Sequence, residues 1–201
     1  MNKATYLICR VIIVMLASNN MAFGAYCSLR DPIAAIKTLY QGSNQYRSIV
    51  AAITDENKNS VKERLPFTLH RSEIGKHTLY LVLENNKPHG FVHARSELAE
   101  WGLIEIAWGM NFDMTINGLF FQRCRSPKCS RELTDRLNVL LKSRSFSEIR
   151  KMLTKNGAET TAHIASDFAK SGDLALLAIR SALKTIAITE IAWKKEITEL
   201  K

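Results

Sequence analysis

Two cysteines, Cys124 and Cys129, stand at a spacing that suits a disulfide. They bracket the turn-forming segment Arg-Ser-Pro-Lys, which can bring the two thiols within bridging distance. On spacing alone, Cys27 is equally able to pair with either of them. The sequence contains neither a Cys-x-x-Cys redox pair nor a Cys-x-x-Cys-His haem motif. We predict a structural bridge between Cys124 and Cys129.

The histidines give a weaker signal, for metal chemistry. His70, His77, His89 and His93 fall in a region of strand-like sequence. His89 and His93 share strand parity, so in one regular strand they would face the same side as a possible ligand pair. Two ligands do not make a metal site, and we expect ordinary sheet histidines. No Gly-x-Ser-x-Gly motif indicates a hydrolase.

The third feature is Ser171-Gly172 at the start of a long apolar segment. A helix that begins here would offer unpaired N–H groups and a partial positive charge, which together suit a phosphate. A purely structural interpretation also holds, with Ser171 as the N-cap and Asp173 as a favourable first-turn acid. Trp101 and Trp108 could stack on a planar ring, although sheet aromatics more often pack in a core.

The elements that must position these residues are strands first and helices afterwards. Period-two or continuous apolar runs predict strands, separated by short turns containing Gly, Asn, Asp or Pro. Connections this short force antiparallel neighbours, so we predict a meander. A shorter β-prone stretch precedes them at 46–53. The strands predicted after it are 67–74, 78–84, 90–96, 103–110 and 115–122.

Helices are predicted on both sides of the strands. Asp31-Pro32 and Thr54 begin two helices before them. After them, Ser130 or Arg131 begins one, and the capping box of Ser145 and Glu148 begins the next. A long final helix runs from Ser171-Gly172 toward residue 200. The fold class predicted is α+β, an antiparallel sheet with helices packed on it.

Four short motifs occur in an order that carries a family resemblance: Gly90-Phe91-Val92, Trp108-Gly109-Met110-Asn111, Ile116-Asn117-Gly118 and Ser171-Gly172. Their order resembles the FMN-binding domain family, found in flavin-carrying subunits of sodium-translocating NADH:quinone reductase, the Rnf complex and small exported flavoproteins. That family has a Gly-aromatic-Val strand, a Val-Gly-Ile-Asp strand end, an Ile-x-Gly strand start and a Ser-Gly-Ala-Thr helix entrance. The resemblance spans residues 31–188.

The resemblance implies an FMN cofactor and an electron-transfer role. It places candidate cofactor-binding residues at the helix entrance and at one strand end: Ser171, Gly172, Asp173, Leu174, Trp108 and Gly109. The family's acceptor Thr, which forms a phosphodiester to FMN, is Leu174 here, and its Ala is Asp173. The family's Glu-Thr segment is also missing. Any flavin is therefore expected to be non-covalent.

The N-terminus has the pattern of a secretory signal peptide. Lys3 and Arg10 flank the start of an apolar run, and Ala22 and Gly24 supply the small residues that signal peptidase requires. The run is too short to span a bilayer. We expect a cleaved signal at 1–24 and a single FMN-binding-like domain at 25–201, exported to the periplasm; an uncleaved anchor is the alternative.

Composition and charge limit the kinds of partner that the protein is expected to bind. With 46% hydrophobic and 23% charged residues, the 201-residue chain is typical of a globular protein and not of a disordered or collagen-like chain. The formal charge of +9 is concentrated at 123–155, where ten cations face three anions. An exported protein is a poor candidate for nucleic acid, so an acidic partner or an anionic membrane surface is the functional interpretation. A solvated helix face is the simpler one. The partner-binding candidates are Arg131, Arg136, Arg150 and Lys151.

Two functions follow from these observations. The first is an exported, non-covalent flavin carrier that serves as an electron-transfer accessory of a membrane respiratory or redox complex. The second is a flavin-free binding or assembly module that docks an acidic partner or membrane surface through the basic segment. In either case we expect a carrier or accessory protein and not a catalyst.

Overall fold

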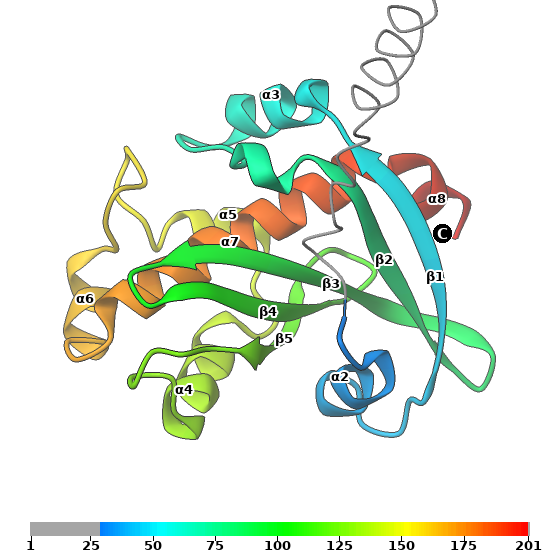
Figure 1. Ribbon diagram of the computed structural model, residues 1–201, viewed down its shortest axis with the longest axis horizontal. Coiled ribbons are helices and arrows are strands. Elements are labelled where there is room, and N and C mark those ends of the chain that lie inside the picture. Colours follow the sequence, from blue (N-terminus) through cyan, green and yellow to red (C-terminus); the bar gives the residue numbers. More distant parts are fainter. Residues whose placement is uncertain (1–28, 201) are drawn as a thin grey trace, which may run out of the picture.

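The computed structural model describes residues 29–200, and their centre is one five-stranded antiparallel sheet. Its strands pair in chain order, as the predicted meander requires (Figure 1). The predicted α+β fold class is confirmed. The predicted signal peptide, the anchor alternative and Cys27 lie outside the described residues. The strands are β1 (Gln45–Ile53), β2 (Gly75–Glu84), β3 (Lys87–Ala99), β4 (Gly102–Met110) and β5 (Ile116–Arg123).

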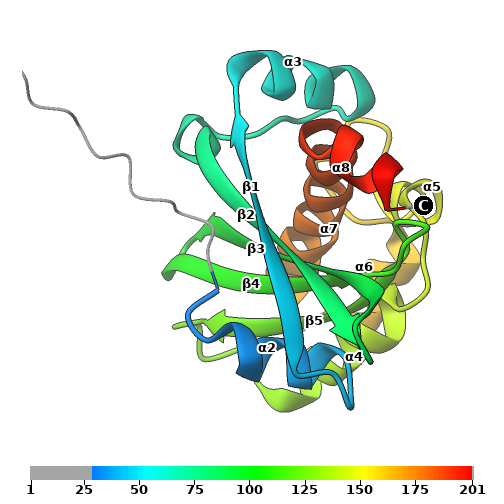
Figure 2. The same ribbon diagram turned by 90° about the vertical axis from the view of Figure 1, so that its right-hand side faces the viewer.

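Helices cover both faces of the sheet. The longest, α7 (Gly172–Ala192), crosses the sheet diagonally (Figure 1), and Figure 2 shows β4 and β5 between it and α2 (Pro32–Leu39). The chain turns at Trp193 into a separate short helix, so the predicted final helix is two helices. The other helices are α3 (Asp55–Arg64), the 3₁₀ turn η1 (Arg71–Glu73), α4 (Arg131–Leu141), α5 (Phe146–Arg150), α6 (Ala162–Asp167) and α8 (Lys194–Glu199).

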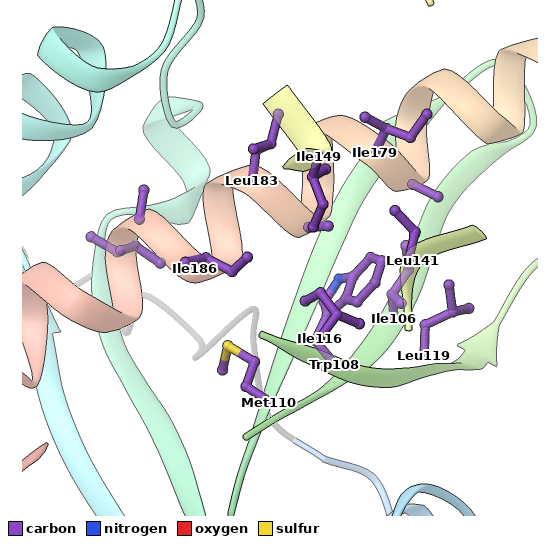
Figure 3. Close-up of a cluster of buried hydrophobic side chains, with 14 of the residues drawn as sticks. Ile106, Trp108, Met110, Ile116, Leu119, Leu141, Ile149, Ile179, Leu183 and Ile186 are labelled. Carbon is purple, nitrogen blue, oxygen red and sulfur yellow. The ribbon is translucent and has the colours of Figure 1, made fainter. Parts of the chain in front are cut away.

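Strand alternation divides the apolar side chains between two cores. Ile106 and Trp108 of β4 lie in the core beneath α7. Ile179, Leu183 and Ile186 of that helix belong to the same core (Figure 3). The intervening β4 side chain belongs to the smaller core under α2. A fully buried Leu or Ile stabilises the fold by roughly 1.5–3 kcal/mol, so the α7 core is the dominant stabilising element.

Several helix starts follow the capping signals in the sequence. The Asp31 side chain accepts the N–H of Ala34, and Pro32 occupies the first position of α2. Thr54 and Ser145 each form a capping box, with Asn57 and Glu148 as their third helical residues. These N-cap hydrogen bonds explain why α2, α3 and α5 begin where the sequence predicts.

One predicted strand is wrong. Residues 67–74 form a loop that contains η1, and β2 begins only at Gly75, whose φ of +135° suits glycine. Local side-chain bonds compete with strand formation there, because His70 caps η1 and Glu73 accepts the backbone N–H of His70. This loop lies beside α7 and contributes to the site described below.

A close approach of α2 to the sheet depends on Gly90 of β3. Its Cα lies so close to α2 that an added Cβ would stand 2.6 Å from the Tyr40 hydroxyl and 2.8 Å from the carbonyl oxygen of Met110. The Tyr40 hydroxyl lies 2.7 Å from that same carbonyl oxygen as a hydrogen-bond donor. Any side chain at position 90 would therefore disturb this contact.

We expect Gly90→Ala to lower the free energy of unfolding by about 1–3 kcal/mol, the usual effect of overpacking a core. Gly172→Ala is the matched control, because a Cβ at position 172 meets nothing within 4 Å. Urea unfolding followed by circular dichroism measures both variants. Equal stability of the two would contradict the close contact at Gly90.

Candidate functional site

A cleft of about 740 Å³ lies along the N-terminal half of α7. Its other walls are the loop before β2 and the connected ends of β3 and β4, which approach that half of α7 in Figure 1. We call it the α7 cleft. Phe67, Leu103 and Leu177 contribute apolar walls, and Arg180 lies at its side with its guanidinium 4.6 Å from the Phe67 ring centre. Ligand sites are commonly apolar clefts of this size with a few polar groups.

The floor of the α7 cleft contains four charged side chains, which we call the ionic cluster: Glu73, Arg95, Glu97 and Lys184. All four residues are buried, and Glu73, Glu97 and Lys184 line the cleft. Arg95 is paired with Glu73, and Lys184 with Glu97; the Lys184 ammonium also lies 3.3 Å from Glu73. Two cations and two anions balance. Burial opposes ionisation of Glu73, but Arg95 and Lys184 outweigh it and hold the pKa of this carboxyl below its ordinary value.

Two buried histidines adjoin the ionic cluster. His77 Nε2 is 2.8 Å from the carbonyl oxygen of Glu73, and His93 Nδ1 is 3.0 Å from the Thr189 hydroxyl. Burial and the nearby Arg95 cation lower the pKa of His77 to about 4 and hold the pKa of His93 well below its ordinary value. Both rings are therefore neutral near pH 7, and they contribute packing and not charge.

The expectation that His89 and His93 face one side is wrong. A bulge in β3 shifts the register with β2 between Val82 and Leu83 and changes the strand parity. His93 then points into the α7 core, whereas His89 is half-exposed beside Tyr40 on the α2 side. Within residues 29–200, no group of three or more His, Cys, Asp or Glu side chains is placed to hold a metal ion.

The predicted helix entrance does stand at one end of the α7 cleft. Asp173 and Leu174 line it, and the space around Gly172 is open. The Ser171 hydroxyl makes no capping hydrogen bond, so the predicted N-cap interaction is absent. Asp173 Oδ1 instead accepts a hydrogen bond from the Lys128 ammonium at 2.9 Å. Leu174 is almost completely buried.

The structure does not bring the other two cofactor candidates to this place. Trp108 is fully buried, and its indole N–H donates to the Ser181 hydroxyl at 3.1 Å, so its ring offers no face to a ligand. Gly109 packs against Leu39 and Tyr40 on the opposite side of the sheet. Trp101 is half-exposed in the turn between β3 and β4.

Cys124 and Cys129 form a disulfide, and their Cα atoms are 6.2 Å apart. This separation is in the range of protein disulfides, and the preferred pairing is confirmed. The pair closes the turn between β5 and α4. That turn also contains Lys128, the partner of Asp173.

The four basic partner-binding candidates divide into two kinds. Arg136 lies over the Phe168 ring and donates to the carbonyl oxygen of Asp167, while Arg150 donates to the carbonyls of Thr154 and Lys155 at 3.0 and 2.6 Å. These two guanidinium groups hold the protein's own loops in place. Arg131 and Lys151 are exposed.

Sequence reasoning missed the ionic cluster, although the sequence contains one usable signal. Arg95 and Glu97 share strand parity with the apolar Phe91. Charged side chains on the buried parity of a strand are rare unless they are paired. This pattern indicated partners elsewhere in the chain, but not which residues they are.

Comparison with known proteins gives no independent guide to the site. Neither the protein-family models, the curated proteins nor the solved structures yield a match to this chain. Of the helices between residues 29 and 200, none has the length and apolar character needed to cross a bilayer.

The buried histidines predict a pH-dependent stability. Below about pH 6.5, His77 and His93 bind protons in the unfolded chain but stay neutral in the folded state. The free energy of unfolding therefore falls as pH decreases. We expect His93→Gln, which keeps a partner for Thr189, to roughly halve this dependence between pH 6.5 and 5. Urea unfolding at several pH values measures it. His163→Gln is the control, because that side chain is 83% exposed; an unchanged slope in His93→Gln would contradict the assignment.

The two kinds of basic residue predict unequal effects on stability. Arg150→Ala removes hydrogen bonds to the three carbonyl oxygens of Leu153, Thr154 and Lys155 and should lower the free energy of unfolding by about 1 kcal/mol. Lys151→Ala, its exposed neighbour, should change it by less than about 0.5 kcal/mol. Thermal and urea unfolding of both variants measure this difference. Equal losses of stability in the two variants would contradict a structural role for Arg150.

Proposed function

We propose that this protein is a non-covalent flavin-binding carrier whose ligand, FMN or a close analogue, lies in the α7 cleft. The observation that carries the proposal is the composition of that cleft: apolar walls along α7, a buried ionic cluster at its floor and a helix N-terminus at its end. FMN has matching parts. Its planar ring system would contact the apolar walls, the polar atoms at one ring edge would meet the ionic cluster, and the anionic phosphate on its flexible chain would lie at the helix N-terminus.

The walls of the cleft suit a planar ring. Leu103 and Leu177 offer apolar surface, and Phe67 adds an aromatic ring. Arg180 stacks on Phe67. Within the part of the chain described, its guanidinium forms no salt bridge with a carboxylate, so it supplies a positive charge to the cleft. Burial of a large aromatic ligand against such surfaces is the main source of affinity in small-molecule sites.

The phosphate end is the weaker part of the fit. The first turn of α7 and the Lys128 ammonium favour an anion, and Gly172 leaves space for it. Asp173, however, already holds Lys128 and repels a phosphate by about 1 kcal/mol at 4 Å in water. FMN must therefore compete with this carboxylate, and modest affinity is expected.

Covalent attachment at the position of the family's acceptor Thr is excluded by chemistry. Leu174 has no hydroxyl to form a phosphodiester, and its side chain is buried. A bound flavin supplies reversible electron transfer, which the protein tunes through hydrogen bonds and charge near the ring. The chain's own contribution is to bind the ring, orient it and shield it from water.

We place this carrier outside the cytoplasm, as an accessory of a membrane redox complex. The signal-like pattern at 1–24 supports export, and the bonded Cys124–Cys129 pair is typical of an oxidising compartment. The alternative, a flavin-free module docked through basic side chains, has less support because Arg136 and Arg150 are engaged in intramolecular contacts.

Flavin titration of the purified protein tests the proposal. Wild-type protein should quench FMN fluorescence with a saturable curve, and Asp173→Asn should bind FMN about fivefold more tightly, since it removes the repelling charge and releases Lys128. Riboflavin, which lacks the phosphate, should bind both proteins equally.

Two results would overturn parts of this picture. Failure of FMN and riboflavin to bind either protein would exclude the flavin carrier and favour the flavin-free module. Tighter riboflavin binding by Asp173→Asn would show that Asp173 acts on the ring and not on the phosphate, and would remove the helix entrance from the phosphate site.

A further inference from the structure

We propose that the floor of the α7 cleft recognises the lactam edge of its ligand, an N–H group beside a carbonyl, through Glu97 and Lys184. In a flavin this edge belongs to the pyrimidine part of the ring. The inference rests on the proposed flavin function, and it adds the residues that determine which ring systems the cleft accepts.

Glu97 provides the acceptor. It lines the cleft, is more than nine-tenths buried, and binds Lys184 through one carboxylate oxygen. Its other oxygen, Oε1, is buried with no hydrogen-bond partner among the residues described. A buried acceptor without a partner is unfavourable, so a ligand N–H that reached it would both form a bond and relieve that cost. The carboxylate must rotate slightly, because neighbouring atoms cover Oε1.

Lys184 provides the donor beside it. An ammonium group has three N–H donors. Two of them are directed to Glu73 and Glu97, and the side chain is still 10% exposed at the cleft floor. Among the residues described, the Lys184 ammonium has these two acceptors, so its third N–H can donate to a ligand carbonyl. A donor adjacent to an acceptor is the complement of a lactam edge, in which carbonyl and N–H also stand side by side.

Charge balance favours a neutral ligand group over an ion. The carboxylates of Glu73 and Glu97 are compensated by Arg95 and Lys184, all within the same buried cluster. An ammonium or a carboxylate on the ligand would add an uncompensated charge to a site of low dielectric constant. A lactam edge is polar without net charge and avoids that penalty.

The length of the cleft agrees with an elongated ligand. Asp173 and Lys184 both line it and are eleven residues apart on α7, which is roughly 16 Å along the helix axis. Side chains on a helix generally tilt toward its N-terminus, which shortens this span. One ligand can then place a phosphate at Gly172 and a ring edge at Glu97.

A comparison of FMN with its N3-methyl derivative tests the proposal. Methylation replaces the ring N–H that Glu97 would accept, so wild-type protein should bind the methylated ligand at least tenfold more weakly. Glu97→Gln should bind FMN about tenfold more weakly and should distinguish the two ligands by less than twofold. Glu63→Gln is the matched control: this exposed carboxylate lies on α3, outside the α7 cleft and the ionic cluster, and its variant should behave like wild type.

The outcomes separate the two claims. If wild-type protein binds neither ligand, the proposed flavin function fails. If it binds FMN and N3-methyl FMN equally, the flavin function stands and the recognition by Glu97 is wrong. Circular dichroism shows whether Glu97→Gln is folded. If this variant is not folded, the comparison of FMN with N3-methyl FMN on wild-type protein still tests whether the ring N–H is recognised.

Discussion

The placement of Lys184 constrains the rest of the structure. It is a charged residue on the buried side of α7, and it is tolerable there only because Glu73 and Glu97 accept hydrogen bonds from its ammonium group at the cleft floor. Breaking such a buried pair by removing one partner typically costs 3–5 kcal/mol. The pairing therefore fixes the register of α7 along β3 and holds the loop before β2 against the helix.

This constraint connects stability with binding. The loop, the ends of β3 and β4, and α7 meet around the ionic cluster, and the cleft exists because these elements are held there. Polar clusters of this kind are stable only when their members are well satisfied. Within residues 29–200, one carboxylate oxygen of Glu97 has no hydrogen-bond partner, and a buried acceptor of this kind is a place where a ligand has much to gain.

Sequence patterns predicted the sheet well and the site poorly. Strand alternation, short turns and the capping residues Thr54 and Ser145 are local signals, and the meander follows from them. The alternation of Phe67 and Leu69 with polar residues favours a strand at 67–74. The hydrogen bonds of His70 and Glu73, which make this segment a loop, are not visible in periodicity. The ionic cluster joins residues up to 111 positions apart. No local pattern specifies which distant partner balances a buried charge.

The turn at Trp193 has a consequence for self-association. β1 is an outermost strand of the sheet, and such strands expose backbone groups that can recruit a strand from another molecule. The indole N–H of Trp193 donates to the carbonyl oxygen of Ile49 at 3.0 Å, and α8 follows directly. The C-terminal segment therefore occupies one backbone acceptor of that border strand, so a strand from another molecule would have to displace the Trp193 indole to pair there.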